Sequence, residues 1–172
     1  MRALTPRRAA LAILLAAAAT VAGALVFEHA LGLRPCKLCL VQRQPYYAAL
    51  PLALLAALAP PRLARVGLWL LAALFLVSAG LGLHHAGVEW GWWAGPNDCG
   101  GTPAPVPGTV GGFLEQLETA RVVSCTEAAW RFLGLSLAGW NALISIGLAG
   151  LAAAAAAGAP GRQGSSSLSQ YR

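Results

Sequence analysis

The sequence predicts an all-α membrane protein, a four-transmembrane-helix bundle, and three observations support this prediction. Hydrophobic residues make up 58% of the 172 residues and charged residues only 10%, whereas a soluble globular chain typically carries about 25% charged residues. The first of four apolar segments is long enough to cross about 30 Å of hydrocarbon at about 1.5 Å per helical residue, and the other three are interpreted as further spans. Backbone polar groups in lipid must be satisfied within each segment, and this requirement favours helices.

The four predicted spans are residues 9–27, 45–60, 66–83 and 133–157. In the second span, Pro45 suits a first helical turn and Pro51 is expected to kink the helix. The first span has an alternative interpretation as a cleaved signal peptide, although its apolar stretch exceeds the usual 7–15 residues or so. All four spans belong to one predicted domain, residues 1–161, followed by a disordered cytoplasmic tail at 162–172.

The charges predict which side of the membrane each loop faces. Three arginines precede the first span, and Arg62 and Arg65 separate the second span from the third. The stretch 89–131 carries five acidic residues and two arginines, a net charge of −3. Basic loops stay in the cytoplasm, so both termini should be cytoplasmic and the loops 28–44 and 84–131 should face outward. The net charge of +6 therefore needs no nucleic acid as a partner.

All the cysteines fall in the two loops predicted to face outward. They are Cys36, Cys39, Cys99 and Cys125. Their confinement to one side indicates disulfide chemistry in an oxidising compartment. The Cys-x-x-Cys spacing of the first two is typical of pairs that cycle between dithiol and disulfide. A zinc site recruiting the other two cysteines or His84 and His85 lacks the usual ligand spacing, so no metal is expected, while two static structural disulfides stay a second alternative.

Arg43 lies four residues after Cys39 and seven after Cys36. If a helix begins near the motif, all three share one helical face. A cation there would stabilise a thiolate, and at the membrane boundary it could also donate hydrogen bonds to the carbonyl oxygen of a bound quinone. The alternative is an arginine that extends to the lipid headgroups. Its position on the outer side, against the charge rule, favours the functional interpretation.

The long outer loop has four further features. Trp90, Trp92 and Trp93 are interpreted as interfacial anchors rather than as a quinone-stacking surface. His84 and His85 could deliver protons or simply form interfacial hydrogen bonds. The Gly- and Pro-rich stretch 96–112 is either a mobile arm or a passive linker. Apolar residues at helical spacing after it predict a short amphipathic helix, which lies on the membrane or packs against the bundle.

Two segments resemble one protein family. Residues 27–43 read FEHALGLRPCKLCLVQR, and they look like the first outer loop and the second-span entry of DsbB proteins. Cys125 and the following WRFLGLS from Trp130, with Trp140, resemble the family's entry to its fourth span. The resemblance covers nearly the whole chain except the Ser-rich tail. The residues from Gln42 to Tyr47 differ from those of the best-studied branch of the family.

The resemblance implies a thiol:quinone oxidoreductase of the bacterial inner membrane, with its cysteines in the periplasm. A DsbA-like thioredoxin-fold protein would be the partner, and the cofactor would be ubiquinone or menaquinone. Cys99 would form the mixed disulfide with the partner, Cys125 would exchange with Cys36, and Cys39 would face the quinone beside Arg43. Electron flow from DsbA through DsbB to quinone keeps the bacterial periplasm oxidising. The resemblance implies that this chain acts as DsbB does, taking electrons from the DsbA-like protein and passing them to quinone.

Three other functions are weighed against this expectation. The chain could be a specialised paralogue that serves one dedicated client, or a non-catalytic membrane scaffold with static disulfides. A bundle like vitamin K epoxide reductase is disfavoured, because the Cys-x-x-Cys of that family comes late in the bundle.

Overall fold

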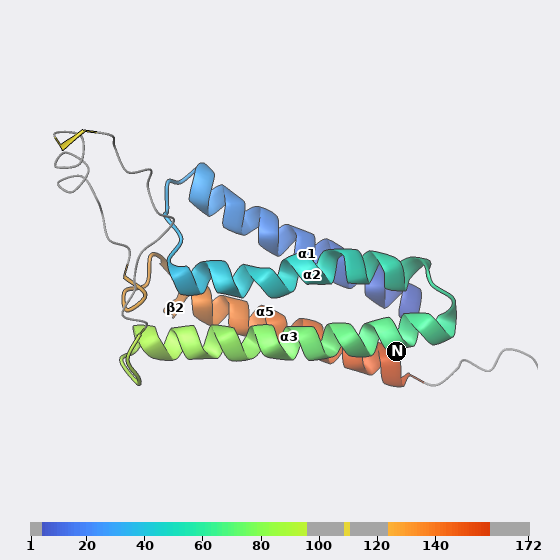
Figure 1. The fold of residues 1–172 in the computed structure, drawn as a ribbon. Coiled ribbons are helices and arrows are strands. Elements are labelled where there is room, and N and C mark those ends of the chain that lie inside the picture. Colours follow the sequence, from blue (N-terminus) through green and yellow to red (C-terminus); the bar gives the residue numbers. More distant parts are fainter. Residues whose placement is uncertain (1–4, 96–108, 111–123, 159–172) are drawn as a thin grey trace, which may run out of the picture.

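The computed structural model describes residues 5–95, 109–110 and 124–158, and four long helices in these ranges form a bundle (Figure 1). They are α1 (Pro6–His29), α2 (Lys37–Leu58), α3 (Pro61–Glu89) and α5 (Leu137–Ala157). The helices cover the predicted spans except at residues 59–60 and 133–136. Within the described ranges, α1, α3 and α5 are long and apolar enough to cross a membrane, and α2 is not among them. The expected helical membrane protein is thus confirmed, while a fourth membrane crossing stays a prediction.

Side-chain caps explain where the helices begin. Thr5 Oγ1 accepts a hydrogen bond from the backbone N–H of Arg8 at 3.4 Å, and Pro6 occupies the first turn of α1. Cys36 caps α2 in the same way, so this helix starts at Lys37. Pro45 therefore lies inside α2 and not in its first turn, which corrects the expectation from the sequence. Because a helix-interior proline removes a backbone hydrogen bond, α2 carries two such interruptions, at Pro45 and Pro51.

A small β-hairpin precedes α5, so the described residues are not purely helical. β1 (Arg131–Phe132) pairs antiparallel with β2 (Leu135–Ser136). The two turn residues, Leu133 and Gly134, have φ of 51° and 81°, as a two-residue hairpin turn with positive φ at both positions requires. The indole of Trp140 donates to the Phe132 carbonyl at 3.0 Å and ties the hairpin to α5. The fourth helix consequently begins at Leu137 rather than at residue 133.

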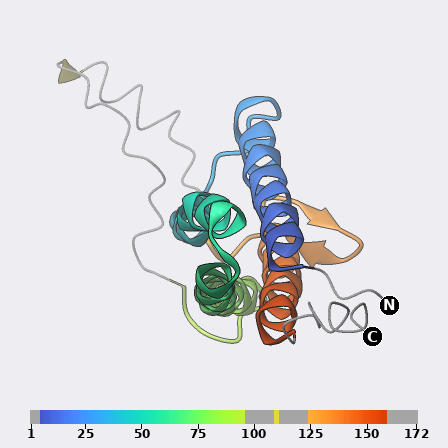
Figure 2. The same cartoon turned by 90° about the vertical axis from the view of Figure 1, so that its right-hand side faces the viewer.

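Small residues let the helices approach closely. The core between the helices consists mainly of alanines, supplemented by a few large side chains such as Ile13, Leu68 and Phe75. α3 packs most extensively against α5, and an end-on view shows the four helices side by side (Figure 2). A Cβ added at Gly82 of α3 would lie 2.9 Å from the backbone nitrogen of Ala142 in α5. In lipid the hydrophobic effect does not bring helices together, because the lipid tails are as apolar as the side chains. Membrane helices therefore associate through close packing of small residues.

Polar side chains also join the helices in the middle of the bundle. Tyr46 of α2 and Ser78 of α3 each lie 2.9 Å from the hydroxyl of Ser145 in α5. The tyrosine ring packs edge-on against Phe75 with ring centroids 5.5 Å apart. Because all three hydroxyl groups are buried, these bonds fix the relative register of three helices.

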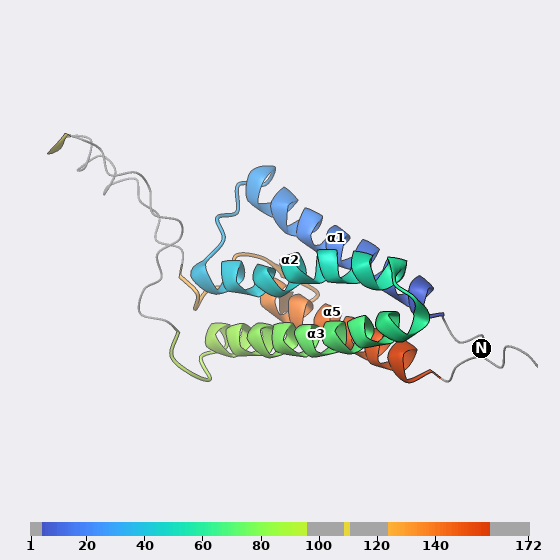
Figure 3. The ribbon, with the colours of Figure 1, turned by 45° about the vertical axis from the view of Figure 1, so that its right-hand side comes forward.

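α1 separates from the other helices toward its C-terminal end, as two views show (Figures 1 and 3). At this same end α2 begins and α3 finishes, opposite the end where the chain starts (Figure 3). A cavity lies at this end of the bundle, lined by residues of α1, of the start of α2 and of the end of α3. Cys99, the predicted arm except residues 109–110, the predicted amphipathic helix and the tail all lie outside the described residues.

Candidate functional site

The first cysteine pair sits at the N-terminus of α2. Cys36 Sγ accepts a hydrogen bond from the backbone N–H of Cys39 at 3.2 Å, and the two sulfurs are 2.6 Å apart. Cys36 is buried, with 3% of its surface exposed, and Cys39 is partly buried. A disulfide needs about 2.05 Å between its sulfurs, so only a small movement separates this dithiol from a disulfide. The motif predicted that the two sulfurs would lie close together, while the start of α2 at Lys37 comes earlier than the first turn expected at Pro45.

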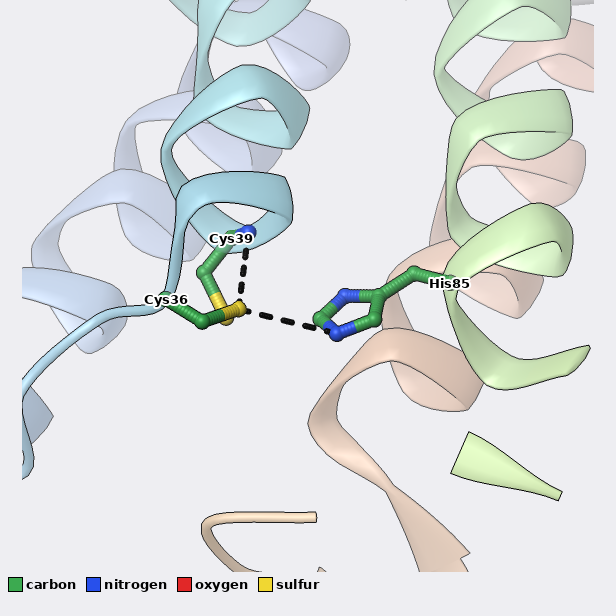
Figure 4. A group of neighbouring side chains, drawn as sticks. All are labelled: Cys36, Cys39 and His85. Carbon is green, nitrogen blue, oxygen red and sulfur yellow. Dashed lines mark hydrogen bonds between the residues drawn. The ribbon is translucent and has the colours of Figure 1, made fainter. Parts of the chain in front are cut away.

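His85 of α3 faces this pair (Figure 4). Its Nε2 lies 3.6 Å from Cys36 Sγ, and the side chain is 3% exposed. The neighbouring His84 is exposed and stacks on the ring of Trp93. The sequence did not distinguish these two histidines. The signal was available in the helical spacing, because Ser78, Gly82 and His85 follow one another on the buried face of α3.

Gln42 and Asn141 determine which nitrogen of His85 carries the proton. Asn141 Nδ2 donates to Gln42 Oε1 at 2.7 Å, and Gln42 Nε2 lies 2.6 Å from His85 Nδ1. An amide nitrogen only donates, so Nδ1 accepts and the proton resides on Nε2, directed at Cys36. The sequence analysis missed both amides. Their signal was polarity, since each is an uncharged polar residue on an otherwise apolar helix face.

The two thiols of the first pair differ in acidity. The hydrogen bond to Cys39 and burial raise the pKa of Cys36 to about 12, although the hydrogen bond from His85 opposes this shift. The hydrogen bond from Cys36 lowers the pKa of Cys39 below its usual value, although burial opposes this. Cys39 is therefore the more acidic thiol of the pair. Behind Cys36, hydrogen bonds connect Asn141, Gln42 and His85 in series.

Cys125 joins the site from the segment before the hairpin. It is fully buried and forms one cluster with Cys36 and Val88, against which Cys39 also packs. A residue 89 positions away in the sequence thus lies beside the first pair. The structure therefore brings together three of the four predicted cysteines, and it does not describe Cys99.

Arg43 points toward α1, where it pairs with Glu28. Its Nη1 donates to Glu28 Oε2, and its Nη2 donates to the carbonyl of Ala24 at 3.5 Å. The side chains of Arg43 and Glu28 are 15% and 27% exposed. Most of the Arg43 side chain is therefore buried against α1. The sequence suggested no partner for Arg43, because α1 and α2 come together only in the folded bundle.

A partly open cavity of about 280 Å³ connects these groups. One wall is the apolar face of α1, from Ala19 to Phe27, and the polar lining includes Cys39, Arg43 and His85. A quinone ring is apolar on its faces and accepts hydrogen bonds at its carbonyl oxygens, so a cavity with these two kinds of lining suits it. Trp90, Trp92 and Trp93 do not line the cavity. Their exposed rings contact one another in tilted and edge-on arrangements, and their role as interfacial anchors stays a prediction.

The chain is similar to known disulfide bond formation proteins. The family model described as "Disulfide bond formation protein DsbB" matches residues 6–155. A disulfide bond formation protein B of Marinobacter nauticus is 38% identical over 138 residues, which are 76% of this chain and 80% of that protein. Its counterpart in Verminephrobacter eiseniae is 36% identical over 81% of this chain and 79% of that protein. The Stutzerimonas stutzeri protein is 33% identical, over 87% and 93%. No solved structure matches the chain significantly.

Proposed function

The chain belongs to the DsbB family of disulfide bond formation proteins, and on this premise we propose that it oxidises a DsbA-like periplasmic dithiol protein with a membrane quinone as electron acceptor. Membership makes it a disulfide-generating oxidoreductase with membrane-spanning helices. One observation carries the finer proposal: Cys36 contacts Cys39 on one side and clusters with Cys125 on the other, beside a cavity lined by Arg43.

The proposed relay begins at the second cysteine pair. A thiolate of the reduced partner attacks the Cys99–Cys125 disulfide at Cys99, and Cys125 leaves as a thiolate. The partner's second thiolate then attacks the mixed disulfide, so the partner departs oxidised and both cysteines are reduced. Each exchange breaks one disulfide and forms one, and the two electrons of the partner's dithiol pass to Cys99 and Cys125.

The second exchange uses the buried cluster. Cys125 attacks Cys36 in the Cys36–Cys39 disulfide, and Cys39 leaves as a thiolate. Cys99 then attacks Cys125 and releases Cys36. The sulfur of Cys36 lies 3.6 Å from His85 Nε2, whose N–H points at it. The result is a restored Cys99–Cys125 disulfide and a reduced first pair. The raised pKa of Cys36 and the lowered pKa of Cys39 support Cys39 as the sulfur that carries the negative charge beside the cavity.

Residues of α1, α2 and α3 would hold the quinone. Arg43 would donate a hydrogen bond to a carbonyl oxygen, and the α1 wall would contact the ring. When bound, a quinone supplies an acceptor for two electrons and two protons, so the net reaction is partner dithiol plus quinone giving partner disulfide plus quinol. Ubiquinone and menaquinone both offer the apolar ring and the carbonyl oxygens that this lining would contact.

We further place the protein in the bacterial inner membrane, with both termini cytoplasmic. The arrangement supports this orientation, because Cys36, Cys125 and the tryptophans share one end of the bundle, and the basic turn with Arg62 and Arg65 lies at the other. The cysteines then face the oxidising compartment.

Quinone reduction by the purified protein tests the proposal. A reduced DsbA-like protein is the donor, and the quinone absorbance is followed for wild type, Cys39→Ala and Cys99→Ala. We expect wild type to consume quinone and both variants to stall. Inert wild-type protein that keeps its disulfides with several donors and quinones would instead support the scaffold with static disulfides.

A further inference from the structure

The reduced first pair lies within a set of groups that ligate soft metals. The ligand atoms of Cys36, Cys39 and His85 all lie within 4.8 Å of one another. Figure 4 shows the imidazole directed at the two sulfurs from the neighbouring helix. Two thiolates and one imidazole are the ligands that zinc prefers. This combination differs from the zinc sites considered from the sequence, which drew on Cys99 and Cys125 or on adjacent histidines.

A fourth potential ligand, Glu89, lies beside His85. Glu89 follows His85 by one helical turn, and its Oε1 lies 3.8 Å from His85 Nε2. The Glu89 side chain is only 5% exposed, and its Oε2 has no hydrogen-bond partner among the described residues. A buried carboxylate oxygen without a partner is costly. A cation bound between Glu89 and the sulfurs would remove that cost.

Two of the separations suit a tetrahedral cation. With metal–sulfur bonds of about 2.3 Å and metal–nitrogen or metal–oxygen bonds of about 2.0–2.1 Å, neighbouring ligand atoms stand roughly 3.3–3.8 Å apart. The Cys36–His85 and His85–Glu89 distances of 3.6 and 3.8 Å agree with this spacing. The sulfurs, 2.6 Å apart, would have to separate by about 1 Å, and the Glu89 carboxylate, which lies outside the set within 4.8 Å, would have to approach them.

The amide pair behind His85 can adapt to metal binding. Ligation through Nε2 moves the imidazole proton to Nδ1, which then requires an acceptor. If the Gln42 side-chain amide rotates so that its oxygen and nitrogen exchange places, the oxygen accepts a hydrogen bond from His85 Nδ1. The Asn141 amide can rotate in the same way. Ser145, whose hydroxyl lies 3.5 Å from Asn141 Oδ1, both donates and accepts. The hydrogen-bonded groups behind the imidazole therefore serve either tautomer.

We propose that the reduced Cys36–Cys39 pair, together with His85 and Glu89, binds a thiophilic divalent cation of the zinc and cadmium class, and that binding holds the pair in its reduced state. Binding displaces the two thiol protons and involves no electron transfer. The disulfide form lacks thiolates, so only the reduced protein binds. Cation binding does not depend on the proposed function, whereas inhibition of quinone reduction by the cation rests on it.

Cadmium titration of the reduced protein tests the site. The full chain carrying Cys99→Ser and Cys125→Ser is reduced in detergent without quinone or partner, and the ultraviolet charge-transfer absorbance of cadmium thiolate is followed. We expect one equivalent to bind, and none after oxidation of the first pair. Because quinone and partner are absent, the outcome is independent of whether the relay operates.

Matched variants separate a built site from a bare dithiol. We expect His85→Ala to weaken cadmium binding at least tenfold, because it removes a ligand, and Glu89→Gln to weaken it as well. His84→Ala, one residue away on the exposed face, should bind like the parent. Equal affinity in His85→Ala, Glu89→Gln and the parent would overturn the proposal, and so would the absence of binding to the reduced parent. Circular dichroism at the helix minima confirms that each variant is folded.

Discussion

Replacing Glu28 with glutamine should weaken the use of quinone even though Glu28 does not line the cavity. Glu28 contacts Arg43, and Arg43 lines the cavity. The substitution keeps the size of the side chain and removes its charge. Without the carboxylate, the guanidinium loses the partner that holds it at the cavity and can extend toward the headgroups instead.

The exposed fractions set the size of the effect. A hydrogen bond to a charged group contributes about 1.5–3 kcal/mol. The contribution here falls below this range, at about 0.7–1.4 kcal/mol, because Arg43 and Glu28 are 15% and 27% exposed and water screens part of the attraction. About 1.4 kcal/mol corresponds to a factor of ten in affinity. We therefore expect the KM for quinone to rise roughly three- to tenfold, with a smaller change in kcat.

Steady-state quinone reduction at saturating partner and varied quinone measures this effect. Glu127→Gln is the matched control, because Glu127 lines the same cavity and loses the same charge, while the partner of Arg43 is left intact. A KM that stays unchanged or falls in Glu28→Gln would refute the reasoning. A fall would mean that Glu28 competes with the quinone for Arg43.

Three further outcomes are expected. Arg43→Ala should weaken quinone use more than Glu28→Gln while both disulfides still form, and normal quinone kinetics in this variant would remove Arg43 from the site. Gly82→Ala should lower the stability of the bundle by about 1–3 kcal/mol, because the added Cβ meets the α5 backbone. Gly80→Ala on the same helix is the control, because a Cβ there enters open space, and it should leave the stability unchanged. Reversible unfolding in detergent measures both. The pKa of Cys36, raised from 9.0 to about 12, means that the folded protein keeps a proton that the unfolded chain loses. The protonated Cys36 thiol should therefore stabilise the reduced protein fully below about pH 9, and this stabilisation should disappear as the pH rises from 9 toward 12. The measurement is the free energy of unfolding of the reduced protein and of Cys36→Ser over this pH range. If the difference between the two does not fall, the prediction is wrong.

The positions of the helices were largely predictable from the sequence, while their ends were not. Apolar segments without charges predict helices because lipid offers no partners to backbone groups. Pro45 and the segment 133–136 were assigned wrongly, since local contacts decided both. A cysteine side chain caps α2, and a hairpin with two positive-φ residues delays α5.

The sequence by itself determined the membrane-helix class, because this depends on composition. It also predicted a redox role for the cysteines and singled out Arg43 as a candidate, because these predictions depend on short spacing and on placement relative to apolar segments. Only the tertiary structure decided which groups surround the sulfurs. His85, Cys125 and Asn141 come from three different parts of the chain, and Glu28 reaches Arg43 across two helices. Such contacts depend on the rotation of each helix about its axis, and that rotation is set by how small residues and polar groups of neighbouring helices fit together.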